Sequence, residues 1–163
     1  MQDQSDEWIA DRLNVAEINA VNDYTGAGYA EINKGLRDSK GKNITDQVRA
    51  LDGALSKYKL GLNAKFYRGM GPIEVQAFEN GVPIYEFKSL SASRSVADAF
   101  LQGQTGNKGG EVVIFNVPKG SKGAYIGMNS TIPGEKEFLL GRGQSYTVRR
   151  VNGVLEVTIH AKD

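Results

Sequence analysis

The sequence has no cysteine and a single histidine, His160, and these shortages exclude most familiar catalytic centres. Disulfide bonds, thiol nucleophiles, serine–histidine triads and ordinary zinc sites all need residues that the chain lacks or holds only once. His160 falls in a predicted strand and is interpreted as structural or solvated. Any chemistry must therefore depend on carboxylates, hydroxyls and guanidinium groups.

An excess of one charge and long apolar runs are also missing. Lys and Arg number 20 against 19 Asp and Glu, a net charge of +1, so no overall field favours nucleic acid or an anionic membrane. No apolar run approaches the length of a membrane span, and the polar, acidic residues 1–7 lack the basic and apolar regions of a signal peptide. We expect a soluble chain with no signal peptide and no membrane partner.

What the sequence does contain is a helical first part and a strand-rich second part. At 163 residues, 40% of them hydrophobic, the chain suits one domain with a proper core. Helices followed by strands are typical of the α+β class, so we expect a single domain over 1–163, mainly helical over 1–60 and mainly strands over 61–163. Apolar residues at helical spacing run from Ile9 to Ala20, from Tyr29 to Leu36 and from Ile44 to Tyr58, and β-type runs span Ala64–Arg68, Val82–Phe87, Glu111–Val117, Gly123–Ile126, Glu135–Leu140, Ser145–Val151 and Val154–His160.

Capping and turn residues refine this prediction. Thr45 is expected to cap the third helix and Gly61 to end it. Residues 95–102 predict a short helix between strands. Asn152 and Gly153 favour a two-residue turn with positive φ, which predicts a C-terminal hairpin.

Two carboxylates one residue apart are the strongest chemical signal. Glu135 and Glu137 lie where a glycine-containing loop meets an apolar run. If this segment is extended, both side chains project to one face, about 7 Å apart, while Lys136 points away. Two like charges this close cost free energy unless solvent, cations or a cationic substrate offset them. An exposed polar strand end is the alternative interpretation.

An arginine and a serine-rich segment are the other polar signals. Arg68 ends a predicted strand ahead of glycines that would let a ligand approach, and its guanidinium matches phosphate oxygens, although a solvated arginine is the alternative. Ser89 and Ser91 share a face if extended; a turn that caps the next helix is a compatible alternative. No P-loop and no strand–GxGxxG–helix pattern occurs.

In that order, Arg68, Ser89-x-Ser91 and Glu135-x-Glu137 resemble the arginine-specific mono-ADP-ribosyltransferases of the bacterial toxin type. Residues 24–37 resemble the N-terminal helix of the enzymatic components of binary actin-modifying toxins, and residues 117–125 are similar to that family's approach to its catalytic loop. The resemblance implies an α+β fold in which N-terminal helices pack on two short, twisted β-sheets that flank an NAD cleft.

The resemblance also implies roles for the matching residues. Glu137 would be the catalytic carboxylate, held by a hydrogen bond from Ser89, and Glu135 the second glutamate, needed for transfer to the target. Arg68 would bind an NAD phosphate, and Phe100 falls where the family stacks an aromatic ring on nicotinamide. Weaker family contacts around NAD match Tyr24, Tyr29, Asn33 and Glu74.

Two departures from the family pattern stand out. Leu90 replaces the usual central threonine of Ser-Thr-Ser, and we expect activity to survive this because the side chain should face away from Ser89. The loop Gly103–Gly110 is longer than in the toxins, and Lys108 in it is a candidate second contact to an NAD phosphate. Residues 127–134 would be the loop that meets the target.

The chemistry suits these residues. A carboxylate stabilises an oxocarbenium-like state at the ribose, and a second carboxylate beside it can orient a guanidinium and assist its proton loss. NAD is then a consumed substrate, and no metal is required. Three alternatives remain: an NAD glycohydrolase with the same site, a non-catalytic interaction module of the same fold, and transfer to nucleic acid, which the net charge disfavours.

The partners expected from the resemblance are NAD and a target protein that presents an arginine, either actin or a bacterial protein. A secreted protein, or one delivered into the cytosol of a target cell, is the expected setting. An antagonist protein, if one exists, would plug the cleft.

Overall fold

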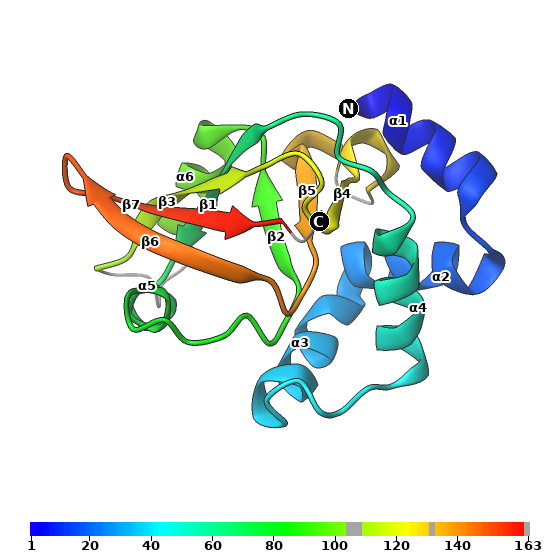
Figure 1. Cartoon of the computed structure of the whole chain (residues 1–163), viewed down its shortest axis with the longest axis horizontal. Helices are drawn as coiled ribbons and strands as arrows, with labels where there is room; N and C mark the ends of the chain where they lie inside the picture. Colours follow the sequence, from blue (N-terminus) through cyan, green and yellow to red (C-terminus); the bar gives the residue numbers. More distant parts are fainter. Residues whose placement is uncertain (104–108, 131–132, 162–163) are drawn as a thin grey trace.

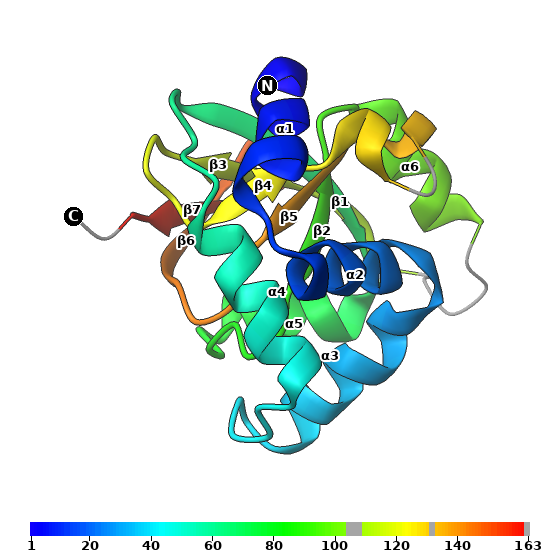
Figure 2. The same ribbon diagram turned by 90° about the vertical axis from the view of Figure 1, so that its right-hand side faces the viewer.

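The computed structural model describes residues 1–103, 109–130 and 133–161. Helices α1 to α4 gather on one side of a twisted sheet (Figure 1), and a view turned by 90° places α2, α3 and α4 in front of the strands (Figure 2). The expected α+β class is confirmed, with helices first and strands after.

The first predicted helix is broken in two. Helix α1 (Gln2–Glu7) continues through the π-helical turn η1 (Trp8–Arg12) and stops at Leu13, which is extended. Asn14 then begins α2 (Val15–Asp23) with a reciprocal capping box, because its side chain accepts from the Glu17 backbone while the Glu17 carboxylate accepts from the Asn14 backbone. This cap is the local reason that the apolar spacing does not give one continuous helix.

The second and third predicted helices are present. A kinked π-helical turn, η2 (Tyr24–Gly28), leads into α3 (Tyr29–Asp38). Helix α4 (Asp46–Ser56) begins at Thr45, whose hydroxyl accepts from the Val48 backbone as predicted. It ends at Ser56 with Lys57 as its C-cap, so Gly61 does not terminate it.

In the described part of the chain, seven strands form one hydrogen-bonded sheet in the order β4-β5-β2-β1-β3-β7-β6. Among these strands, β3 and β7 are parallel neighbours and the other neighbours are antiparallel. The strands are β1 (Ala64–Met70), β2 (Lys88–Ser91), β3 (Glu111–Val117), β4 (Gly123–Tyr125), β5 (Glu137–Leu140), β6 (Ser145–Val151) and β7 (Val154–His160). The last two form the predicted hairpin, with positive φ at Asn152 and Gly153.

The two expected sheets are joined at a narrow junction. Strands β1 and β2 pair through a single position, Tyr67 with Ser91, so β4-β5-β2 and β1-β3-β7-β6 form two parts of one sheet. Phe66 of β1 stacks on Phe138 of β5, with ring centroids 4.3 Å apart. Apolar packing therefore holds together two parts that share little backbone pairing, and the polar site residues of β1, β2 and β5 meet at this junction.

Two elements differ from the prediction between Gly71 and Ser91. Helix α5 (Pro72–Glu79) was not expected, and the predicted strand over Val82–Phe87 is irregular, with β2 beginning only at Lys88. Helix α6 (Arg94–Gln102) appears where a short helix was predicted, and Ser93 caps it. In the described ranges, no helix is long and apolar enough to cross a membrane.

Candidate active site

Ser89 and Glu137 form the centre of the site. Strands β2 and β5 are antiparallel neighbours, and the Ser89 Oγ donates to Glu137 Oε2 at 2.8 Å. This is the contact that the resemblance implies. The Glu137 residue is 7% exposed, and burial raises the pKa of its carboxyl above the ordinary value, whereas the hydrogen bonds from Ser89 and Ser130 lower it and the charge of Glu135 raises it.

Glu135 reaches the same hollow by a different route from the one predicted. It does not belong to the strand: it ends a 3-10 turn, η5 (Pro133–Glu135), and Lys136 follows with φ +49°. Ser91 Oγ donates to the Glu135 carbonyl at 2.7 Å, and the Lys136 carbonyl accepts from the Ala92 backbone. Both glutamates line one hollow of about 350 Å³, so the turn, rather than strand alternation, brings them together.

Arg68 lies two residues before the end of β1 and is held from two sides. Its Nε is 3.1 Å from Glu74 Oε2, and its Nη1 donates to the Ser89 carbonyl at 2.8 Å. The second contact ties the arginine to the strand that carries the serine. Burial acts to raise the pKa of Glu74, but the charges of Arg68 and Lys88 outweigh it and lower that pKa to about 2.

A chain of ion pairs extends from Arg68 and includes residues that sequence reasoning missed. Lys88 Nζ lies 2.5 Å from Glu74 Oε2 and 2.9 Å from Glu86 Oε1, and Arg37 Nη1 lies 2.5 Å from Glu86 Oε2. Lys88 directly precedes Ser89, and a lysine between the apolar Phe87 and a predicted site residue was the signal that could have found it. These ion pairs place alternating positive and negative charges along one wall of the site.

Arg68 separates two hollows. Besides the one with the glutamates, it lines a larger hollow of about 600 Å³ between α3, α5 and the segment before β2. Phe100 of α6, half exposed, lines the glutamate side, while Tyr29 and Asn33 of α3 and Glu74 of α5 line the larger side.

Tyr24 lines neither hollow and supports Asn33 from behind. It is buried, its hydroxyl donates to the Phe87 carbonyl, and it accepts from Asn33 Nδ2 at 2.8 Å. Burial raises the pKa of Tyr24, so the phenol stays protonated. Tyr24 therefore fixes the orientation of the Asn33 amide.

An unpaired acceptor lies behind the lining of the larger hollow. Asn33 is 9% exposed, and its enclosed Oδ1 has no hydrogen-bond partner in the described parts of the chain. Buried polar atoms are usually paired, so a local shift of the lining would give this oxygen a ligand donor as its partner. The amino and hydroxyl groups of an adenosine supply such donors, and Arg68 between the hollows suits a diphosphate. These residues therefore fit NAD laid across both hollows.

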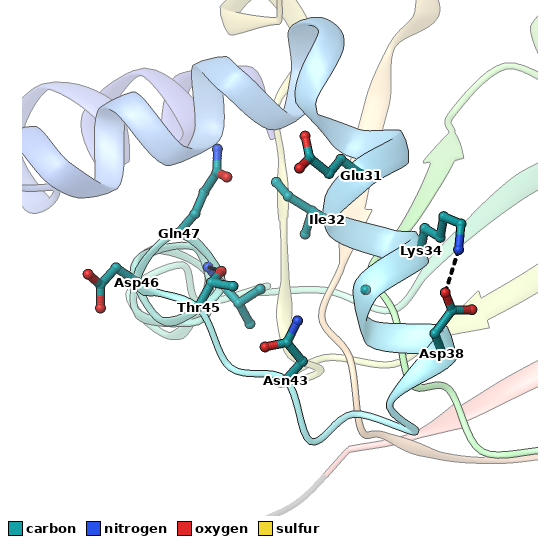
Figure 3. A pocket seen from close by; sticks show the side chains of 10 residues that line it. Glu31, Ile32, Lys34, Asp38, Asn43, Thr45, Asp46 and Gln47 are labelled. Atoms are coloured by element: carbon teal, nitrogen blue, oxygen red, sulfur yellow. Dashed lines mark hydrogen bonds and ion pairs between the residues drawn. The ribbon is translucent and has the colours of Figure 1, made fainter.

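A third hollow, of about 510 Å³, opens between α3 and the start of α4 (Figure 3). Its polar lining includes Glu31 and Asp46, and Lys34 pairs with Asp38 across one turn of α3. None of the predicted site residues lines it. Lys108 lies outside the described residues. Within those residues, no cluster of three or more histidine, cysteine or acidic side chains suits a metal ion.

Helices on a sheet of two loosely joined parts, with an arginine, Ser-x-Ser and Glu-x-Glu at the junction, define the class of toxin-type ADP-ribosyltransferases. The family model of the ADP-ribosyltransferase exoenzyme matches residues 2–162. The chain belongs to this family.

Individual relatives agree with the family. The NAD(+)–arginine ADP-ribosyltransferase EFV of Enterococcus faecalis is 44% identical over 164 residues, which cover 98% of this chain and 34% of that protein. A mono-ADP-ribosyltransferase C3 of Clostridium botulinum C phage is 28% identical over 83% of this chain and 64% of its own length. The chain thus spans about a third of the first relative and less than two thirds of the second.

A solved structure shares the fold. The ADP-ribosylating toxin BECa of a binary enterotoxin of C. perfringens, solved with NADH, superposes with a TM-score of 0.74 at 23% identity, over 98% of this chain and 46% of BECa. This likeness extends over nearly all of the present chain.

Proposed function

We propose that this chain transfers ADP-ribose from NAD to an arginine side chain of a protein. The observation that carries the proposal is the Ser89–Glu137 hydrogen bond beside Glu135 in one hollow that Arg68 also lines. The arginine specificity named for the Enterococcus relative and the NADH in the BECa structure support it. We also propose that residues 1–163 form a single catalytic domain.

In this mechanism each polar residue has one task. Arg68 binds the diphosphate, and Phe100 packs on the nicotinamide. Glu137, oriented by Ser89, hydrogen-bonds a ribose hydroxyl and stabilises the positive charge that develops as the bond from ribose C1′ to nicotinamide breaks. Nicotinamide leaves with the bonding electron pair as a neutral molecule. Burial of Glu137 strengthens this electrostatic effect because water screens it less.

Glu135 acts on the acceptor. A guanidinium is protonated at ordinary pH and is a poor nucleophile, so a carboxylate beside the reaction centre is needed to orient it and accept its proton. The arginine nitrogen bonds to C1′ while that proton passes to Glu135. The partly exposed side chain of Glu135, next to buried Glu137, suits contact with a large target.

The experiment follows nicotinamide release and ADP-ribose transfer to agmatine, an arginine analogue, in the presence of NAD. Glu137→Ala should lose both activities, and Glu135→Ala should lose transfer while slow NAD hydrolysis remains. Glu31→Ala, a surface carboxylate that lines only the hollow of Figure 3, is the matched control and should retain both.

The rival functions give different results in the same assay. Nicotinamide release without transfer to agmatine or to a lysate protein indicates an NAD glycohydrolase. Absence of NAD binding indicates a non-catalytic module. Label that appears on nucleic acid rather than on protein indicates the third alternative.

The target protein, the cellular setting and the antagonist protein are also proposals. We propose that the target is actin or a bacterial protein, and that the enzyme acts after secretion or delivery into a target cell. An antagonist protein would plug the hollows around Arg68, and a complex that leaves Arg68 and Glu137 open to NAD would count against this.

A further inference from the structure

Helix α1 lies against the turn that leads to the two glutamates. Figure 1 shows α1 beside the 3-10 turn η4 (Gly127–Asn129), and three side chains of the helix reach it. Gln2 Oε1 accepts from the Met128 backbone at 2.9 Å, and Ser5 Oγ donates to the Ile126 carbonyl at 3.2 Å. The beginning of the chain is thus bonded to a segment more than 120 residues away.

Asn129 closes this contact from the other side. Its Nδ2 donates to Asp6 Oδ1 at 2.9 Å and to Ser5 Oγ at 3.1 Å. Gln2 Nε2 donates to the same Asp6 oxygen at 2.8 Å, so one carboxylate oxygen joins helix and turn. Hydrogen bonds to a charged acceptor are stronger than neutral ones, which makes Asp6 with Asn129 the central pair.

The close approach depends on a glycine. Gly127 has φ +52°, and a Cβ at this position would lie 2.2 Å from Gln2 Oε1 and 2.5 Å from Tyr125 Cε2. Any other side chain would displace the Gln2 amide and the Tyr125 ring, and the positive φ would add backbone strain. The helix itself is held at its far end, because buried Trp8 donates from Nε1 to the Ala54 carbonyl of α4 at 2.8 Å.

The turn connects to both glutamates. Ser130 directly follows it, and a hydrogen bond from Ser130 lowers the pKa of Glu137. Glu135 ends the turn η5, which packs against η4, and the Glu135 backbone is held by Ser91. Glu137 has Ser89 as a second support, whereas the partly exposed Glu135 side chain depends on where its backbone is placed.

We infer that α1 is a positioning element for the acceptor side of the site. This inference rests on the proposed function: the Asp6–Asn129 pair holds Glu135 where it can contact the acceptor arginine, and so favours transfer over hydrolysis. Misplacing a catalytic group by about 1 Å is enough to reduce a rate by a hundredfold. Loosening the pair should therefore affect transfer before NAD cleavage.

The test measures the ratio of ADP-ribosylagmatine to free ADP-ribose in Asn129→Ala and Asn129→Asp. Asn129→Asp should lower the ratio about fivefold and more than Asn129→Ala, because it places two carboxylates together, while the KM for NAD stays within about twofold. The double variant Asp6→Asn/Asn129→Asp restores a donor and an acceptor in reversed order and should recover the ratio. Asp3→Asn, an exposed change on the same helix, is the control.

Several outcomes would overturn the inference. An unchanged ratio in Asn129→Asp, with wild type active in transfer, removes it and leaves the proposed function intact. Equal loss of transfer and hydrolysis, with no recovery in the double variant, shows only a stability role. Wild type that consumes no NAD removes the proposed function and the acceptor role with it.

Amide hydrogen exchange at Met128 adds a readout that is independent of activity. The exchange rate should rise in Asn129→Asp and return to the wild-type value in the double variant. An unchanged exchange rate would show that the Asp6–Asn129 pair does not hold the turn.

Discussion

At the scale of single residues, the ionisation of Glu137 is set by groups that act in opposite directions. Burial raises its pKa, and the Ser89 hydrogen bond lowers it. We therefore predict that Ser89→Ala raises the pKa of Glu137 further, because the carboxylate loses a donor while it stays buried. The acid limb of the pH profile of NAD hydrolysis should move to higher pH, together with a lower plateau.

The charge of Glu135 provides a companion test of opposite sign. It raises the pKa of Glu137, so Glu135→Gln should lower that pKa and move the acid limb of NAD hydrolysis to lower pH. NAD hydrolysis is the measurement because transfer should be lost in this variant. If the acid limb of the pH profile moves in the same direction in Ser89→Ala and in Glu135→Gln, the electrostatic account of the site is contradicted.

Lys88 gives a prediction about substrate binding. It is 6% exposed and shares Glu74 with Arg68, so Lys88→Met leaves Glu74 and Glu86 without their common cation and allows Arg68 to turn toward them. We expect the KM for NAD to rise about tenfold with a smaller change in kcat.

The control for Lys88 is a second lysine on a buried carboxylate. Lys57 Nζ lies 2.6 Å from Glu17 Oε1, away from both hollows that Arg68 lines. Lys57→Met should cost stability and leave the KM for NAD unchanged. If the two variants change the KM alike, Lys88 acts only through stability.

At the scale of elements, the sequence predicts what depends on local patterns and fails where one residue changes the backbone direction. Helix α4, its Thr45 cap and the Asn152–Gly153 hairpin follow from spacing and turn chemistry, and the structure has them. The prediction that the backbone is extended from Glu135 onward was wrong, because Lys136 has positive φ. Lysine rarely adopts this conformation, and no pattern in the sequence indicates it. The two glutamates still face one hollow, because Ser91 holds the turn through tertiary contacts.

Helix α5 shows the same limit. Its first residue is Pro72, a favourable N1 residue, but Ile73 is exposed and the apolar spacing is weak, so periodicity misses it. The next apolar run contains Pro83, which cannot donate a ladder hydrogen bond, and the structure has no strand there. Pro72 and Glu74 could have predicted that a helix starts here. They could not have predicted that Glu74 contacts Arg68.

The packing of α6 on β1 gives an element-scale prediction. A Cβ at Gly69 would lie 2.4 Å from the Ala97 carbonyl oxygen and 2.9 Å from Leu101 Cβ, so Gly69→Ala must push α6 away from the sheet. Because α6 carries Phe100, we expect a higher KM for NAD together with a loss of about 1–3 kcal/mol in the free energy of unfolding. Urea unfolding and NAD kinetics measure the two effects.

The matched control is Gly61→Ala, where a Cβ would meet nothing within 4 Å. It should leave both quantities nearly unchanged. Normal stability and KM in Gly69→Ala would mean that α6 adjusts without cost, and that Phe100 is not placed by this contact.

At the scale of the whole molecule, Glu74 joins parts of the fold that share little backbone pairing. From α5 it binds Arg68 of β1 and Lys88 of β2, the two strands that pair at a single position. The polar network of the site therefore also connects the two parts of the sheet. The near-zero net charge of the chain hides this local concentration of charge, which is why composition alone could not locate it.

This connection predicts how the whole molecule responds to acid. The pKa of Glu74 falls from 4.5 to about 2 on folding, so its ionised form contributes stability above pH 4.5 that is lost as the pH falls toward 2. The contribution is about 3 kcal/mol at most, since one pKa unit corresponds to about 1.4 kcal/mol and the side chain is partly solvated. Glu137 acts with the opposite sign, because its raised pKa makes its ionisation unfavourable for stability as the pH rises.

Glu74→Gln should therefore be less stable than wild type at neutral pH, and the difference should shrink as the pH approaches 2, where wild type has lost the same contribution. Urea unfolding at a series of pH values between 2 and 7 measures this convergence. Glu31→Gln, on the exposed face of α3, is the control and should follow the wild-type curve. A difference between Glu74→Gln and wild type that stays constant down to pH 2 would show that packing of α5, and not the charge on Glu74, connects the two parts of the sheet.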